Sequence, residues 1–273
     1  MKLKELLTKT NKFSKNEEKY LPSSFDLIGE VALIHISKKI KNKEKIIANA
    51  LLKNNKNIQT VYSKGKHFGK LRKQKIKFLA GKKSEEVTYK ESGCLFKFNI
   101  KTCFFSPRLS TDRLEIAKQV KTREKVLVLF AGIAPYAIVL AKIAKPKKVT
   151  CIELGKEACK YAKENARLNK VNIEIIQGDV KKICKKVKEK YDRIVMPRPQ
   201  LDYDFLKEAF LISKKGTIIH FYDFVQEKDI EKVKDKIRKA AKKAKKKVKI
   251  LKVKKIREIA PYKSHIRIDF QII

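Results

Sequence analysis

The stretch VLVLFAGIAP, Val126 to Pro135, decides how this chain folds. An apolar run of strand length ends here in a turn of small residues, and the next apolar run, Lys148 to Ile152, ends in the acid Glu153. A further acid, Asp179, follows a third run of this kind. A strand, a tight turn, a helix and a second strand with a terminal acid form a Rossmann-like unit, which binds a nucleoside cofactor at the carboxyl ends of its strands. We therefore expect an α/β domain around this segment.

The turn after the first strand is a poor cradle for a pyrophosphate. It offers Gly132 and then Ala134 and Pro135, whereas the dinucleotide fingerprint has three glycines. Glu153 follows about twenty residues later, where its carboxylate accepts both ribose hydroxyls, and Asp179 is placed to accept the adenine amine. A cofactor with ribose and adenine but no phosphate fits this pattern, which indicates S-adenosylmethionine. The alternative is an ordinary α/β domain with a tight turn and solvated acids at its strand ends.

Length and composition exclude several classes of protein. The 273 residues suffice for one large or two modest domains, and an apolar share of 43% supplies a core. No apolar run is long enough to span a membrane, and the first residues lack the apolar segment of a signal peptide. The five cysteines are odd in number and contain no CxxC pair, so we predict neither a disulfide framework nor a metal site. We expect a monomer in the reducing cytoplasm.

The net charge of +40 predicts a polyanionic partner. An AT-rich genome would explain why Lys is used in place of Arg, but codon usage does not explain why only 29 acids oppose 69 bases. We therefore favour nucleic acid as the partner. The Lys-rich run from Lys239 to Lys247 fits an RNA-facing stripe and a merely solvated helix face equally well.

The chain divides by pattern into three parts. Residues 1–20 are polar and read as a basic arm, residues 21–110 as a small α+β domain that interacts with RNA, and residues 111–273 as the Rossmann-like domain. In the small domain the pattern predicts strands over 31–36, 60–62, 75–79 and 95–100 and a helix over 43–52. In the Rossmann-like domain it predicts, besides the cofactor unit, helices over 112–119 (with Thr111 as N-cap), 203–212 and 227–247, and strands over 193–196, 217–222, 248–253 and 266–273. The last two strands suit the antiparallel end of a class I methyltransferase sheet, which is mostly parallel and seven-stranded.

Several blocks of sequence resemble one family. They are PSSFDLIGE (22–30), FGKLR (68–72), LAG (79–81), ESGC (91–94), FSPRLSTDR (105–113) and FAGIAP (130–135). In this order they are similar to blocks of the archaeal and eukaryotic tRNA (guanine-37-N1)-methyltransferases, a family that includes wyosine-pathway relatives. The resemblance covers the chain from residue 21 to the C-terminus.

The resemblance implies methyl transfer from S-adenosylmethionine to N1 of the guanosine that follows the anticodon, with tRNA as partner and the target base extruded. In the family, the Glu of a "TER" block is the proposed base, and an Arg of the small domain stabilises the charge on O6. These roles fall on Asp112 and Arg72, so that both domains would build one site. Asp112 could instead be an acid in the first turn of a helix, where it suits the helix dipole. Arg72 could instead make a surface or phosphate contact.

The remaining candidate residues combine the cofactor pattern with the resemblance. For cofactor binding they are Arg108, Phe130, Gly132, Glu153, Leu154, Asp179, Val180 and Pro197, and for substrate binding Phe104, Arg113 and Arg198. Arg108 and Arg113 are also candidates for organising the domain interface or for contacting RNA phosphate, because a guanidinium forms bidentate contacts in either setting.

The chain departs from the family pattern at three positions. Asp112 is one methylene shorter than the family Glu, Phe104 stands where relatives often carry Tyr, and MPRP (196–199) replaces the "NLP" or "NPP" element that contacts the target base. Arg198 is the candidate for a substitute donor. We also expect the extra N-terminal domain of many relatives to be missing, and with it part of the dependence on the tRNA elbow.

Three alternatives stay open at this stage. The first is methylation of a tricyclic wyosine precursor at the same position, and the second is a tRNA-binding relative without catalysis. The third and weakest is a small-molecule methyltransferase, which the basic charge and the family-like small domain argue against.

Overall fold

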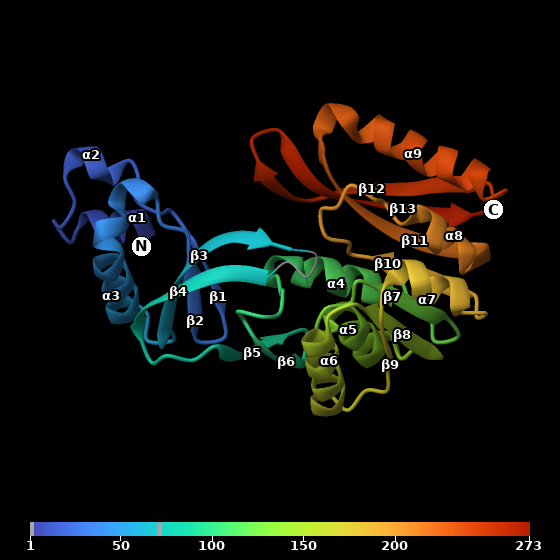
Figure 1. The fold of residues 1–273 in the computed structure, drawn as a ribbon, viewed down its shortest axis with the longest axis horizontal. Helices are drawn as coiled ribbons and strands as arrows, with labels where there is room; N and C mark the ends of the chain where they lie inside the picture. The colour runs from blue at the N-terminus through green and yellow to red at the C-terminus, as the bar shows by residue number, and fades with distance from the viewer. Residues whose placement is uncertain (1–2, 70–72) are drawn as a thin grey trace. The chain divides into compact units, whose positions relative to one another are not determined.

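The computed structural model describes residues 3–69 and 73–273 and divides into two compact units, Met1–Pro107 and Arg108–Ile273 (Figure 1). We call them the small and the large unit. The boundary lies close to the one expected after residue 110.

The small unit is built on a four-stranded sheet in the order β1-β2-β3-β4. β2 and β3 are parallel and the other neighbours antiparallel. A separate hairpin pairs β5 with β6. The elements are α1 (Leu3–Thr8), α2 (Lys15–Glu18), β1 (Phe25–Ile28), β2 (Val31–Ile34), η1 (Lys38–Lys43), α3 (Glu44–Asn54), β3 (Thr60–Phe68), β4 (Lys73–Gly81), β5 (Glu86–Glu91) and β6 (Cys94–Asn99). The α+β class is therefore as expected, although β1 and β5 were not predicted.

The first twenty residues do not form a separate arm. Leu3 and Leu7 lie one helical turn apart on one face of α1, and both are buried in the core of the small unit together with Phe13. This core also contains Ile47 and Leu51 of α3. The sequence pattern missed this packing because three apolar side chains among many lysines look like an exposed segment until a partner helix covers them.

The large unit is a seven-stranded sheet in the order β12-β13-β11-β10-β7-β8-β9. The five strands from β11 to β9 are parallel, and β13 and β12 close the sheet as an antiparallel pair. The strands are β7 (Lys125–Leu129), β8 (Lys148–Glu153), β9 (Glu174–Gln177), β10 (Tyr191–Met196), β11 (Ser213–Gln226), β12 (Val248–Ala260) and β13 (Lys263–Ile272). The predicted Rossmann-like methyltransferase sheet is confirmed.

Helices cover both faces of this sheet. α4 (Ser110–Ala117), α5 (Pro135–Ala144) and α6 (Lys156–Leu168) pack in sequence with one another, and α7 (Val180–Lys186), α8 (Leu206–Leu211) and α9 (Ile230–Lys243) do the same (Figure 1). Short 3₁₀ turns, η2 (Pro107–Leu109) and η3 (Glu227–Asp229), precede α4 and α9.

The predicted bounds differ at the start of α4. The N-cap position is Leu109, so Thr111 already lies within the first turn and is not the predicted cap. The reason is local: η2 runs directly into α4 and supplies the turn that a capping side chain would otherwise stabilise. Among the described residues, no helix combines the length and the apolar character needed to cross a membrane.

The sheet has two chemically different edges. At the carboxyl edge, β7, β8, β9 and β10 end together while β11 continues to Gln226, and such an edge is where open α/β sheets bind ligands. At the amino edge, the same strands begin. Glu153 ends β8 at the carboxyl edge, and the predicted residues Gly132 and Asp179 follow the ends of β7 and β9 there.

Candidate cofactor and nucleic-acid site

Glu153 joins the ends of three parallel strands at the carboxyl edge. Its Oε2 accepts a hydrogen bond from the main-chain N–H of Gly132 at 2.8 Å, and its Oε1 accepts one from Gly155 at 2.7 Å. Its carbonyl oxygen accepts from Gly178 at 2.8 Å. A carboxylate has about four lone-pair positions, so each oxygen retains one for a ribose hydroxyl. The side chain that sequence assigned to the ribose therefore also holds the two neighbouring turns in place.

The turn after β7 is backbone-strained. Phe130, Gly132 and Ala134 have φ values of 56°, 58° and 65°, and non-glycine residues in this region cost about 1 kcal/mol or more each. Asn165 of α6, which is fully buried, supports the turn by donating from Nδ2 to the carbonyl of Ile133 at 3.4 Å. Sequence reasoning gave Asn165 no role, because its partner lies in another helix–strand unit.

An aromatic cluster stands beside this turn. The ring of Phe130 packs edge-on against Phe205 at 4.8 Å, and Phe205 packs edge-on against Tyr203 at the same distance. The Nζ of Lys181 lies 3.6 Å from the centre of the Tyr203 ring. Tyr203 and Phe205 belong to the β10–α8 loop and had not been predicted. Their contact with Phe130 adds an apolar wall to the carboxyl edge.

The other predicted cofactor residues lie around the same edge. Asp179 is the N-cap of α7, and its Oδ1 accepts from the N–H of Lys181 at 2.8 Å, which leaves Oδ2 available for an adenine amine. Leu154 is 44% exposed, whereas Val180 is buried and Pro197 half-buried. In the ranges 3–69 and 73–273, no group of three or more His, Cys, Asp or Glu side chains is placed to hold a metal ion.

Asp112 is buried within the large unit and is only 3% exposed. Its Oδ2 accepts hydrogen bonds from the hydroxyls of Tyr136, at 2.8 Å, and Tyr222. Its Oδ1 accepts from Arg267, and the Nζ of Lys254 lies 3.9 Å away. Burial, reinforced by the Asp112 carboxylate, raises the pKa of both tyrosines well above 10, so both remain protonated donors. Three donors thus occupy three of the about four lone-pair positions of this carboxylate, and a lysine lies nearby.

This contact is one end of a continuous buried network. Arg267 donates to both oxygens of Asp269 at 2.8 and 3.0 Å, and Asp269 contacts Nδ1 of His220 at 2.6 Å. Nε2 of His220 lies 2.8 Å from Arg193, which forms a bidentate pair with Glu124 at 2.7 and 3.0 Å. Burial lowers the pKa of His220, although Asp269 opposes the shift, so a neutral ring donates from Nδ1 and accepts at Nε2.

Two predicted substrate residues have other partners. Arg113 is 1% exposed, with its guanidinium 5.6 Å from the centre of the Tyr136 ring. Arg198 is 4% exposed and donates to the carbonyls of Tyr222, Pro199 and Leu201 at 3.0–3.3 Å and to Asp223. Both guanidiniums therefore stabilise the large unit itself, because each is enclosed by acceptors or rings that sequence alone does not bring together. Arg198 fixes the loop that follows β10.

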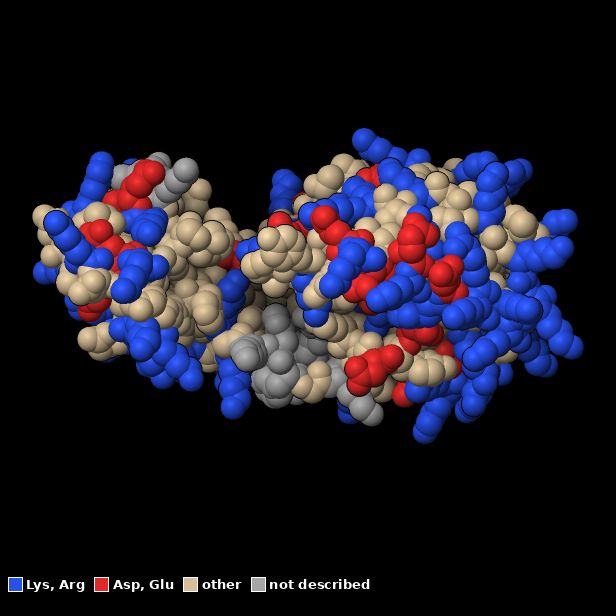
Figure 2. Space-filling view, turned by 90° about the horizontal axis from the view of Figure 1, so that it is seen from above, with Lys and Arg blue, Asp and Glu red and all other residues tan. Residues whose placement is uncertain are grey.

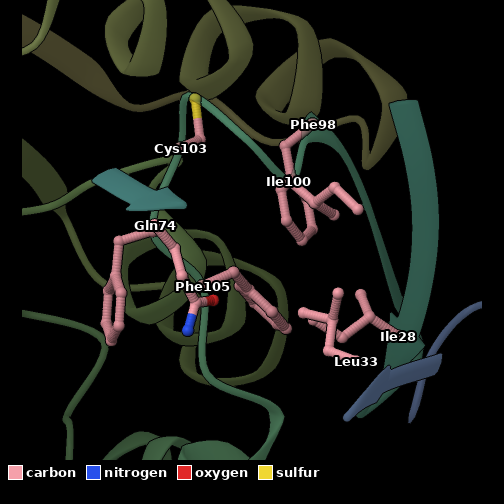
Figure 3. A pocket seen from close by; sticks show the side chains of 8 residues that line it. Ile28, Leu33, Gln74, Phe98, Ile100, Cys103 and Phe105 are labelled. Carbon is pink, nitrogen blue, oxygen red and sulfur yellow. The ribbon is translucent and has the colours of Figure 1, made fainter. Parts of the chain in front are cut away.

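The last three candidates lie at or before the start of the large unit. Arg108 is exposed in η2, and Arg72 lies outside the described residues. Phe104 lines a cavity of about 20 Å³ within the small unit, together with Phe98, Ile100 and other apolar side chains (Figure 3). That volume is enough for about one water molecule, so a nucleobase does not fit this cavity.

The match to a family model covers most of the large unit. The TRM5/TYW2 methyltransferase domain matches residues 87–251. The chain belongs to this family. A second model of the TRM5/TYW2 group, the TYW2 N-terminal domain, matches residues 3–84, so the match includes the helices that were expected to form an arm.

Individual members of the TRM5/TYW2 family are similar over most of the chain. The tRNA (guanine(37)-N(1))-methyltransferase Trm5b of Pyrococcus abyssi is 36% identical over 93% of this chain and 76% of its own length. The tRNA (guanine(37)-N(1))/4-demethylwyosine(37)-methyltransferase Taw22 of Nanoarchaeum equitans is 34% identical over 92% of this chain and 100% of its own. A structure of aTrm5 in complex with tRNALeu aligns with a TM-score of 0.86 at 26% identity, over 100% of this chain and 78% of that one.

Proposed function

We propose that this member of the TRM5/TYW2 family transfers a methyl group from S-adenosylmethionine to N1 of guanosine at position 37 of tRNA. The observation that supports it most is the carboxyl edge, where Glu153 joins three strand ends beside a strained Gly132 turn. This arrangement provides acceptors for a ribose and no cradle for a phosphate. Relatives whose names give this activity are similar over most of the chain.

The reaction sets clear demands on the site. The N1 lone pair forms the new bond to the methyl carbon, the C–S bond breaks, and its electron pair remains on a neutral thioether. The N1 proton has to leave to an acceptor, and the negative charge that develops on O6 has to meet a donor. In this proposal Glu153 and Asp179 orient the cofactor through ribose and adenine, Phe130, Leu154, Val180 and Pro197 contact it, and Arg108 approaches it from η2.

For Asp112 we propose a positioning role in place of the base role that the family resemblance assigns. The Asp112 carboxylate is only 3% exposed, and its oxygens already accept hydrogen bonds from Tyr136, Tyr222 and Arg267. Its contacts instead hold the first turn of α4 against β11 and β13. They thereby fix Arg108, which lies in η2 immediately before that helix. Arg72 keeps its proposed role as the O6 donor.

The partner in this proposal is the anticodon arm of tRNA, bound by a monomer in the cytoplasm. The charge of +40 is the chain's own support for a polyanion, and Figure 2 shows Lys and Arg side chains over much of the face of the large unit seen there. The similar structure of aTrm5 in complex with tRNALeu adds to this support. Binding through phosphates should weaken steeply with salt.

The deciding experiment compares two tRNA transcripts that differ only in G or A at position 37. We expect labelled methyl groups from S-adenosylmethionine on the G transcript alone, at many turnovers per protein. Label on both transcripts would place the target elsewhere. Tight tRNA binding without turnover would instead support a binding protein.

A second candidate substrate is 4-demethylwyosine at the same position. It is favoured by the loop after β10, where Pro197 has no side-chain amide and the guanidinium of Arg198 is already occupied by four acceptors of the large unit. One similar protein carries both activities in its name. Nucleoside analysis after reaction with tRNA that contains guanosine or 4-demethylwyosine distinguishes the two, because only the preferred base yields methylated product at low enzyme concentration.

A further inference from the structure

A groove opens at the amino edge of the large unit, where the parallel strands begin. Its volume is about 590 Å³, and its basic lining residues are Lys121, Arg123, Lys125, Lys147, Arg193 and Lys214. The irregular start of β11 forms part of its wall: the pairing of β11 with β10 jumps from Ser213 to Ile218 around Gly216, which has a φ of +88°. The groove therefore lies at the end of the sheet away from the cofactor turn.

The two acids of the groove are already neutralised within the protein. Glu124 forms the buried bidentate pair with Arg193. Asp192 pairs with Lys214 at 2.6 Å and accepts from the main-chain N–H of Lys125 at 2.8 Å. The carboxylates therefore hold the floor of the groove in place and do not compete for the outer cations.

Three cations of the groove have no acidic partner. Lys121, Arg123 and Lys147 are exposed, and none of their side chains forms an ion pair or hydrogen bond in the described part of the chain. An exposed cation without a partner in the fold is well suited to bind a phosphate, because no ion pair within the protein has to be broken first.

The basic surface continues from the groove to the end of α9. Lys246 donates to the carbonyl and hydroxyl of Ser213 at 2.7 and 2.8 Å, and the N–H of Ile273 donates to the carbonyl of Lys247 at 3.0 Å. These contacts hold the turn after α9 at the amino edge. Figure 2 shows Lys and Arg crowded at the right-hand end of the large unit, the end at which Figure 1 places the C-terminus.

The C-terminal end of α9 differs from the turns before it, because its exposed lysines have no ion-pair partner within the described ranges. From Lys232 to Arg238, the cations Lys232, Lys234 and Arg238 are each paired with an acid three residues earlier on the chain, at 2.6–2.8 Å. At the C-terminal end of the helix, Lys242 and Lys243 are exposed and join no ion pair among the described residues. Exposed cations without an ion pair therefore occur both in the groove and at the end of α9.

We propose that the amino-edge groove binds the phosphate backbone of tRNA outside the anticodon arm. The proposal rests on tRNA being the substrate, and it adds a second contact surface to the one at the carboxyl edge. β7 has five residues and is about 17 Å long, which sets the separation of the carboxyl and amino edges. A tRNA whose anticodon arm is bound at the carboxyl edge therefore reaches the amino-edge groove with another part of the molecule. The contact supplies affinity and orientation and carries no base specificity.

The test uses the triple variant Lys121→Gln, Arg123→Gln and Lys147→Gln. Its matched control is Lys232→Gln, Lys234→Gln and Arg238→Gln, which removes the same charge from ion-paired positions on α9. Filter binding measures the affinity of each protein for full-length tRNA and for the isolated anticodon stem–loop as salt is varied, and steady-state methylation gives kcat and KM.

We expect the groove variant to lose about 2 units of salt slope and at least about fivefold in affinity for full-length tRNA. Its kcat and its affinity for the stem–loop should match those of the wild type. Equal losses in the control variant, or equal losses on the stem–loop, would overturn the proposal. The wild type could bind tRNA more tightly than the groove variant and yet not methylate it. That result would support the groove proposal and refute only the proposed activity.

Discussion

The hydroxyl of Tyr136 donates a 2.8 Å hydrogen bond to Oδ2 of Asp112, within the buried network that also holds this acid to Arg267. A helix-start acid that sequence comparison marks as catalytic is therefore enclosed by donors of its own unit.

Asp112→Asn should lower both stability and activity. Arg267 loses a charged acceptor but keeps Asp269 and Glu115, so we expect a loss of about 1–3 kcal/mol in the free energy of unfolding, measured by denaturant titration. Asp235→Asn, which breaks the exposed pair with Arg238, should cost less than about 1 kcal/mol and serves as the control.

Activity measurements then decide between positioning and proton transfer. If Asp112 positions α4, Arg267→Gln should reduce kcat about as much as Asp112→Asn does. The double variant should then reduce kcat little further than either single variant. The apparent pKa of the pH–rate profile should stay unchanged. A loss above about 100-fold in Asp112→Asn alone, together with loss of the pH dependence, would restore the base role.

Glu153→Gln should weaken S-adenosylmethionine binding by at least about tenfold, because a charge-assisted hydrogen bond to a ribose hydroxyl is lost and the amide leaves one of the two turn N–H groups without its acceptor. Calorimetric titration of the cofactor measures this change. Glu157→Gln in the first turn of α6, which is exposed, should leave cofactor affinity unchanged. Equal affinity in the wild type and Glu153→Gln would show that the ribose is bound elsewhere.

Arg198→Lys tests whether the loop after β10 is fixed from within. Lysine keeps the charge but cannot serve four acceptors in the geometry of a guanidinium, so we expect a destabilisation of about 2–4 kcal/mol and a raised KM for tRNA. Thermal unfolding and steady-state kinetics report on the two effects. An unchanged melting temperature with a reduced kcat would instead indicate direct contact between Arg198 and the target base.

Acid should destabilise the large unit below about pH 4.5. Burial alone would raise the pKa of Glu115, but hydrogen bonds from Lys254, Arg267 and Lys252 outweigh it and lower the pKa from 4.5 to about 2. Glu189, hydrogen-bonded to two lysines, likewise has its pKa lowered to about 2. A depressed folded-state pKa adds stability that is present above the unfolded-state value and is lost as pH falls through the folded one.

The measurement for this prediction is urea unfolding between pH 7 and pH 3. We expect the double variant Glu115→Gln and Glu189→Gln to be less stable than the wild type at pH 7 and to change less with pH over this range. Parallel pH curves for the two proteins would contradict the assignment.

Local pattern was sufficient for much of the fold. The apolar runs and the small-residue turn around Gly132 predicted the Rossmann-like unit, because strand length, turn chemistry and the placement of Glu153 are all properties of neighbouring residues. The same reasoning missed the packing of α1, whose Leu3 and Leu7 are buried only because α3 lies beside them.

The sequence by itself determined the methyltransferase sheet, the acids at its carboxyl edge and the family to which its motifs belong. Only the tertiary structure decided the surroundings of Asp112 and Arg198 and the uncompensated charge at the amino edge. Arg267 lies 155 residues from Asp112 along the chain, and Tyr222 lies 110 residues away. The strength of an acid or a cation depends on which charges and donors surround it in space, and chain neighbours do not supply them here.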